Sequence, residues 1–182
     1  MTFPDIMVDI ETTGRDPERT AMIQLAGVRF NFNEQIIDTA NMFNKSLMIP
    51  DNRYWEEDTR QWWGKQKREV LQGIFASMEP TREVMQKFAD WVGPPQNKPV
   101  RFWAKPVTFD YQFVLSYLKQ YEIHSPFHYR WVTDMNSFIR GLARDPDVES
   151  HYVEFQGDAH NALMDSINQI NALFEAKKEY KK

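Results

Sequence analysis

Residues 7–14, MVDIETTG, constrain the fold more than any other short segment of this chain. Their apolar members predict a buried strand, yet Asp9 and Glu11 alternate with them. Side chains two positions apart on a strand point to the same face. Taken alone, such a pair is more often exposed at a strand end. If the strand is buried, two carboxylates lie side by side next to the core and repel each other unless something neutralises them.

Composition limits the classes of protein that fit. The chain has 182 residues, of which 42% are hydrophobic, and this suits one domain spanning 1–182. It has no cysteine, which excludes disulfides, thiolate zinc sites and a cysteine nucleophile. With neither a signal pattern nor a long apolar run, we expect a cytoplasmic protein without membrane contact. The net charge of −4 means that a nucleic-acid partner would need a local basic patch or bound metal ions.

Hydrophobic periodicity and turn residues predict the order of the elements along the chain. Three strands come first in hairpin-like succession, then helices, then a strand, a helix, a strand and a final helix. This order favours an α/β fold in which helices pack on a mixed sheet. The predicted strands are 7–14, 21–32, 35–47, 100–104 and 129–135, and the predicted helices are 58–70, 81–92 (with Thr81 as cap), 109–121 and one from 159 onward.

Two later segments carry further acids. Asp110 stands in the first turn of the helix that follows a strand, where the helix dipole favours an acid in any case. His160 stands at the entrance of the last helix and Asp165 inside it. If these elements converge on the first strand, four carboxylates meet, and divalent cations must offset their repulsion. Oxygen ligands without thiolates favour Mg²⁺ or Mn²⁺.

At these residues the sequence resembles the DEDD superfamily of 3′→5′ exonucleases, a branch of the ribonuclease H-like fold. The first motif of that family, D-x-E-T, matches residues 9–12, and its second motif matches Thr108-Phe109-Asp110. The third motif, a histidine followed five residues later by an aspartate, matches His160 and Asp165 and is typical of the DEDDh subclass. The resemblance spans nearly the whole chain.

The resemblance implies a role for each motif residue. Asp9 would bridge two Mg²⁺ or Mn²⁺ ions, while Glu11 and Asp165 would help to hold the ion on the nucleophile side. Asp110 would serve the other ion, and His160 would take the proton from the attacking water. The unperturbed pKa of histidine, near 6.5, suits a general base at neutral pH.

A closer likeness is to a phage and prophage branch that includes T-even bacteriophage exonuclease A and mycobacterial exoribonuclease-like proteins. It carries Trp-Trp-x-x-Gln, here Trp62 to Gln66, and a tryptophan ahead of the second motif, here Trp103. It implies substrate contacts by Thr12, Trp63, Gln66 and Trp103, a possible homodimer and, for a phage or prophage gene, the host cytoplasm. Many relatives have Gly-Asn or His-Asn before the second motif, where this chain has residues 104–107, AKPV.

Residues 54–70 interleave aromatic and basic side chains, which can stack bases and contact phosphates. The alternative is a tryptophan packed into the core beneath a solvated basic face. Because adjacent residues on a helix point in different directions, we expect one of Trp62 and Trp63 to be buried and the other available.

Two other features are less persuasive. His124 and His128 have the spacing of a helical metal pair, but Ser125-Pro126 makes a continuous helix improbable. Asp134 ends a predicted strand but matches no motif, so we expect a supporting or structural role.

The sequence thus predicts a metal-dependent 3′→5′ exonuclease that acts on single-stranded RNA or DNA and releases nucleoside 5′-monophosphates. Two alternatives stay open. One is a hydrolase of very short oligonucleotides, which the acidic net charge slightly favours. The other is a nucleic-acid-binding module of the same fold without turnover.

Overall fold

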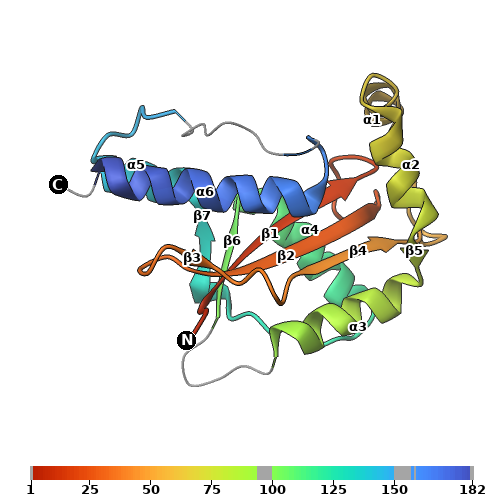
Figure 1. Ribbon diagram of the computed structural model, residues 1–182. Helices are drawn as coiled ribbons and strands as arrows, with labels where there is room; N and C mark the ends of the chain where they lie inside the picture. Colours follow the sequence, from red (N-terminus) through yellow and green to blue (C-terminus); the bar gives the residue numbers. More distant parts are fainter. Residues whose placement is uncertain (1, 94–99, 150–156, 158, 181–182) are drawn as a thin grey trace.

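A computed structural model describes residues 2–93, 100–149, 157 and 159–180. In these residues a seven-stranded mixed sheet runs in the order β5-β4-β2-β1-β6-β7. Strand β3 pairs with the end of β2 that lies beyond its pairing with β4. Helices cover both faces of the sheet (Figure 1). The strands are β1 (Asp5–Thr12), β2 (Met22–Asn31), β3 (Ile36–Ile37), β4 (Phe43–Leu47), β5 (Met78–Glu79), β6 (Arg101–Ala104) and β7 (Val132–Asp134).

All four predicted helices are present in the predicted order, but the first is divided in two and one further helix was not predicted. They are α1 (Glu57–Trp63), α2 (Arg68–Ala76), α3 (Thr81–Val92), α4 (Val107–Gln120), α5 (Met135–Ala143) and α6 (Ala162–Tyr180), with a 3₁₀ turn η1 at Tyr129–Trp131. None of these described helices combines the length and apolarity needed to cross a bilayer.

Strand β1 forms the centre of the sheet. It pairs antiparallel with β2 along its whole length and parallel with β6 over Asp5 to Met7 only. Its side chains alternate between the two faces. Ile6, Val8 and Ile10 pack against α3 and α4, whereas Met7 packs against α5 and α6. Since Asp9 and Glu11 share the face of Met7, the alternation turns both acids toward α6.

Several predicted elements differ from the structure. The helix predicted over 58–70 is two helices, since α1 ends at Trp63 directly before Gly64, a poor helix former. The third strand is divided into β3 and β4, and residues 129–131 form a turn rather than part of a strand. Helix α5 is not among the predicted elements. Thr81 is not a cap: it is the first residue of α3, and its hydroxyl donates to the Met48 carbonyl.

Arg53 fixes the loop between β1 and β2. Its guanidinium donates to the carbonyls of Pro17 and Thr20 at 2.6 and 2.8 Å and to the Ser116 hydroxyl at 2.8 Å. It also lies 3.9 Å from the centre of the Tyr117 ring. Because this arginine is buried, it ties the loop beside the end of β1 to helix α4.

Replacing Arg53 with methionine is expected to lower the free energy of unfolding by about 3 kcal/mol, because buried carbonyls lose their charged donor. Urea denaturation measures the change. Arg19→Met in the same loop is the control: its side chain is 72% exposed and pairs only with Asp16 at the surface, so about 0.5 kcal/mol or less should be lost. Equal losses in the two variants would contradict this account of the loop.

Candidate active site

Three of the predicted acids lie together on the face of the sheet that α6 covers. Asp9 and Glu11 come from β1 and Asp165 from the first turn of α6. One carboxylate oxygen of each lies within 4.8 Å of the others. The elements that the sequence places far apart therefore converge, as expected.

Asp110 completes the acidic group from α4. Its side chain is buried, and its Oδ1 accepts a hydrogen bond of 3.2 Å from the backbone amide of Ile10, between the two acids of β1. This amide lies beyond the short stretch of β1 that pairs with β6. Asp110 is outside the group of three, but its charge raises the pKa of both Asp9 and Glu11.

Burial raises the pKa of all four acids, and repulsion between carboxylates adds to it for Asp9 and Glu11. Burial is the larger cause for Asp9 and Glu11, and the neighbouring carboxylates add to it. The pKa of Glu11 rises to about 8, and burial raises that of Asp110 to about 7. Burial also raises the pKa of Asp165 above its ordinary value. All four carboxylates can therefore be fully ionised at neutral pH only if a positive charge lies between them.

The donor set fits a hard divalent cation. All four side chains offer oxygen, which Mg²⁺ and Mn²⁺ prefer. Two oxygens on one Mg²⁺ can lie up to about 4.2 Å apart, given metal–oxygen distances of about 2.1 Å. The three oxygens, all within 4.8 Å of one another, are therefore near the spacing that one shared ion requires.

His160 lies at the approach to α6, beside the acids. Its backbone φ is 63°, in the left-handed region. The backbone amides of His160 and Asn161 donate hydrogen bonds to the Asp165 carboxylate, and the histidine's charge lowers the pKa of Asp165. The imidazole centre lies 4.7 Å from the ring of Trp62 and 6.4 Å from that of Trp63, edge to face in both cases.

A cavity of about 530 Å³ opens next to the acids, at the end of β1. Its size lies within the range of small-molecule sites. Trp62 and Phe109 contribute aromatic surface, and Arg15 contributes a cation. The lining residues are Ile10, Glu11, Thr12, Gly14, Arg15, Asp58, Thr59, Trp62, Trp63 and Phe109.

Of the two adjacent tryptophans, one is buried and the other exposed, as expected. Trp63 is 3% exposed, and its Nε1 donates a 3.0 Å hydrogen bond to the Thr12 carbonyl. Trp62 is 40% exposed. Thr12 and Trp63 both line the cavity, whereas Gln66 is not among its lining residues and donates to the Trp62 carbonyl at 3.2 Å.

Trp103 lies in the core. Its side chain is 3% exposed and packs among Phe30, Phe32 and Phe138, and its Nε1 donates a 2.8 Å hydrogen bond to Asp5. It is not among the residues that line the cavity beside the acids, so its substrate contact stays a prediction.

Asp134 has the structural role expected of it. Its Oδ1 accepts from the Ser137 amide at 2.8 Å and caps α5, and its Oδ2 accepts from the Val107 amide at 3.0 Å. The first turn of α4, which carries Asp110, is thereby held to the end of β7.

Gln169 is a site residue that the sequence analysis missed. Its Nε2 donates a 2.7 Å hydrogen bond to Oδ1 of Asp9. It lies four residues after Asp165 on α6, and residues with this spacing share a helix face. This spacing from Asp165 was the one feature of the sequence from which a place for Gln169 beside the acids could have been predicted.

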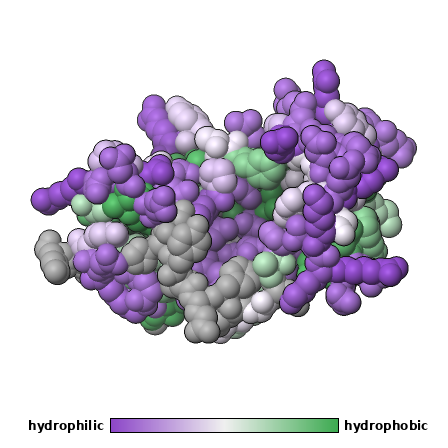
Figure 2. All heavy atoms as spheres, turned by 90° about the horizontal axis from the view of Figure 1, so that it is seen from above, coloured by the Kyte–Doolittle hydropathy of each residue, from purple (hydrophilic) through white to green (hydrophobic). Residues whose placement is uncertain are grey.

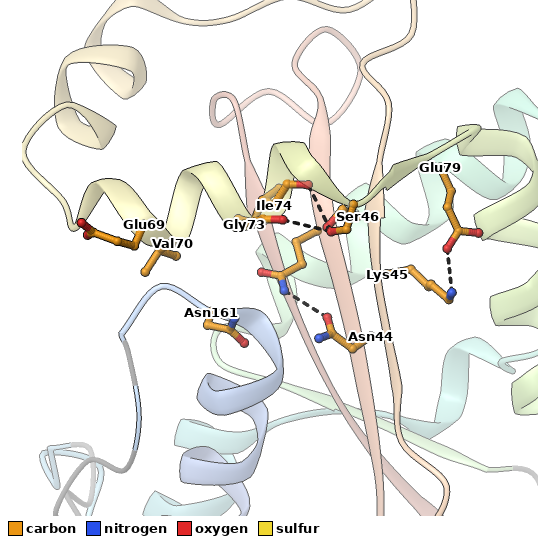
Figure 3. A pocket seen from close by; sticks show the side chains of 11 residues that line it. Asn44, Lys45, Ser46, Glu69, Val70, Gly73, Ile74, Glu79 and Asn161 are labelled. Carbon is orange, nitrogen blue, oxygen red and sulfur yellow. Dashed lines mark hydrogen bonds and ion pairs between the residues drawn. The ribbon is translucent and has the colours of Figure 1, made fainter.

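A second cavity, of about 390 Å³, lies between α2 and the N-terminal end of α6 (Figure 3). Gln24 is one of its lining residues: its Oε1 accepts from the Ala162 amide at 3.1 Å, and its Nε2 donates to Asn44 at 3.0 Å. Gln24 pairs with Glu11 across the two strands. It thus ties the start of α6, and with it the His160 segment, to the sheet beside the acids.

The face that carries α1 and α6 is mostly hydrophilic (Figure 2). Hydrophobic residues emerge between hydrophilic ones near its middle. The candidate site, which α1 and α6 flank, therefore lies on a mostly polar face.

Solved nucleases share this fold. Escherichia coli exonuclease I in complex with single-stranded DNA is 15% identical, with a TM-score of 0.71 over 98% of this chain and 41% of that one. Schizosaccharomyces pombe Pop2p, in its Mg²⁺- and Mn²⁺-bound form, is 11% identical, with a TM-score of 0.74 over 98% and 84%. Cell-death related nuclease 4 is 20% identical, with a TM-score of 0.69 over 96% and 64%. This chain thus spans about two fifths of exonuclease I.

The fold is that of the ribonuclease H-like nucleases, and the family model is that of a 3′-5′ exoribonuclease domain. No curated protein sequence matches the chain. The model of the 3′-5′ exoribonuclease Rv2179c-like domain matches residues 4–176, and the chain belongs to that family.

Proposed function

We propose that this exonuclease is metal-dependent, acts on single-stranded nucleic acid and releases nucleoside 5′-monophosphates. The observation that carries the proposal is the arrangement of Asp9, Glu11, Asp110 and Asp165 beside a cavity of about 530 Å³, with His160 next to them. The family's description as an exoribonuclease favours RNA over DNA.

In the proposed mechanism the carboxylates of Asp9, Glu11, Asp110 and Asp165 would hold divalent cations such as Mg²⁺ or Mn²⁺. Two such ions would supply an activated water and neutralise the charge that builds on the phosphate and the leaving oxygen. His160 accepts the proton of the water at a ring nitrogen, and Asp165 orients the histidine segment through its backbone amides. Pop2p supports the choice of ions, since its structure contains Mg²⁺ and Mn²⁺.

The cavity at the end of β1 receives the terminal nucleotide. Thr12 and Trp63 form its inner wall, while Trp62 and Phe109 offer aromatic surface to the base. Such stacking tolerates any base and contributes about 1–3 kcal/mol per base. The size of the cavity supports removal of one nucleotide at a time, and exonuclease I supports a single strand because its structures contain single-stranded DNA.

The free energy of substrate binding must come from the ions and the cavity, because the net charge of −4 supplies no general attraction for a polyanion. This is the observation that keeps very short oligonucleotides as a second substrate class.

The test uses 20-residue RNA and DNA strands, labelled at the 5′ end, with Mn²⁺. We expect the labelled strand to give a ladder that shortens one nucleotide at a time, and chromatography of the unlabelled products to show nucleoside 5′-monophosphates. A duplex with a blunt 3′ end and a 3′-phosphorylated strand are the controls, and both should be cut at least about tenfold more slowly. Comparison with a dinucleotide separates the two substrate classes. Binding without any product would favour the non-catalytic alternative.

A further inference from the structure

Trp62 lies on a rigid support. It is held edge to face against Trp63, with ring centres 5.1 Å apart. Trp63 is buried and donates to the carbonyl of Thr12, the residue that follows Glu11 on β1. The position of Trp62 is therefore fixed relative to the strand that carries two of the acids.

His160 is the residue that needs such support. It precedes α6, and a non-glycine residue with φ of 63° is in a sparsely populated region of backbone space. Its imidazole meets the ring of Trp62 at 4.7 Å with an interplanar angle of 78°, the geometry that aromatic pairs prefer. A continuous line of contacts thus runs from Thr12 through Trp63 and Trp62 to the imidazole.

We propose that Trp62 is a positioning residue, which sets the orientation of the His160 imidazole relative to the acids of β1. The proposal rests on the role of His160 in the proposed function. It gives Trp62 a second task besides offering its exposed surface to the terminal base. A general base must lie within hydrogen-bond reach of the proton that it accepts, and a displacement of about 1 Å can cost about a hundredfold in rate.

The two tasks of Trp62 have different kinetic signatures. A residue that only stacks the base raises KM, and its effect disappears when the terminal base is absent. A residue that orients His160 lowers kcat, and its effect persists on a strand that ends in an abasic nucleotide. If Trp62 only stacks the base, the effect of replacing it is the same with or without His160. If Trp62 positions the imidazole, the effect on kcat requires that His160 is present.

The central experiment is a double-mutant cycle of Trp62→Ala and His160→Ala. In the native background, Trp62→Ala should lower kcat about tenfold or more on both normal and abasic 3′ ends. In the His160→Ala background the same change should lower kcat less than about twofold. Trp62→Phe, which keeps an aromatic edge, should restore most of the loss. An equal loss of kcat in both backgrounds, or a loss confined to KM, would overturn the proposal.

The matched control is Trp131→Ala, because Trp131 is also an exposed tryptophan, at 44%, but lies on η1. Its kcat should equal that of the native enzyme. Trp62 is itself partly exposed, so the variants should fold, and circular dichroism checks this.

A second measurement needs no turnover. The chain has four histidines, so the imidazole signals of His160 can be assigned in an NMR spectrum by comparison with His160→Ala. Because the Trp62 ring lies 4.7 Å from the imidazole, it should change the chemical shifts of these signals. Trp62→Ala should therefore alter these chemical shifts, whereas Trp131→Ala should not. If the native enzyme releases no mononucleotide, the proposed function fails. If it does so but Trp62→Ala leaves the His160 signals in place, only the inference about Trp62 fails.

Discussion

The Asp9→Asn variant is expected to lose at least about a thousandfold in kcat while keeping its fold. Asparagine has nearly the same shape and can still accept the hydrogen bond from Gln169. It cannot supply the negative charge that holds the proposed ions, and ions of this kind contribute several kcal/mol to the stabilisation of the transition state. A loss of about 4 kcal/mol corresponds to about a thousandfold in rate.

Asp165→Asn should behave in the same way, since its carboxylate lies in the same group of three. Release of mononucleotides in saturating Mn²⁺ measures the effect. Asp90→Asn is the control because Asp90 is an exposed acid on α3, which packs on the opposite face of the sheet. Retention of more than about a tenth of the native rate in either site variant would refute the proposed metal site.

Without metal, the protein is expected to lose stability as the pH rises. The pKa of Glu11 is about 8 in the folded protein and 4.5 in its ordinary state, so the folded protein binds more protons than the unfolded chain between these values. Stability therefore falls as the pH rises through this window, and the loss is complete above about pH 8. A difference of a few kcal/mol corresponds to a drop in Tm on the order of 10 °C.

The measurement is Tm at pH 5 and pH 8, in chelator and in Mn²⁺. Mn²⁺ should raise Tm far more at pH 8, where the carboxylates must ionise to fold around it. Glu11→Gln is the matched control, since glutamine does not titrate. This variant should show a smaller pH slope in chelator, exceed the native protein in Tm at pH 8 and gain less from Mn²⁺. Identical pH slopes in the two proteins would contradict the burial of an ionisable Glu11.

The acids of β1 could be placed from the sequence because a strand alternates with period two. Once Met7 is buried on one face, Asp9 and Glu11 must lie on the same one. That Asp110 and Asp165 belong to the same site could be predicted only by considering them together with the acids of β1. Each is unremarkable as a helix-start residue, and their approach to β1 depends on how α4 and α6 pack.

The contacts around these acids could not be predicted, for a related reason. Whether Trp62 or Trp63 turns inward depends on the rotation of α1, which the short helix and Gly64 leave open in the sequence. The core packing of Trp103 was not predicted, because the buried acceptor of its Nε1, Asp5, stands nearly a hundred residues earlier in the sequence. Only the fold brings such residues together.

The short pairing of β6 with β1 leaves room for Asp110 beside β1. In the parallel register of these strands, a few more residues of β6 would reach Ile10 and occupy its amide. Pro106 precedes α4 instead, so that amide is left for Asp110. The enzyme's fourth acid therefore occupies the position of a missing strand segment. An insertion that lengthened β6 would complete the sheet and displace that carboxylate, so it would cost activity while leaving the core intact.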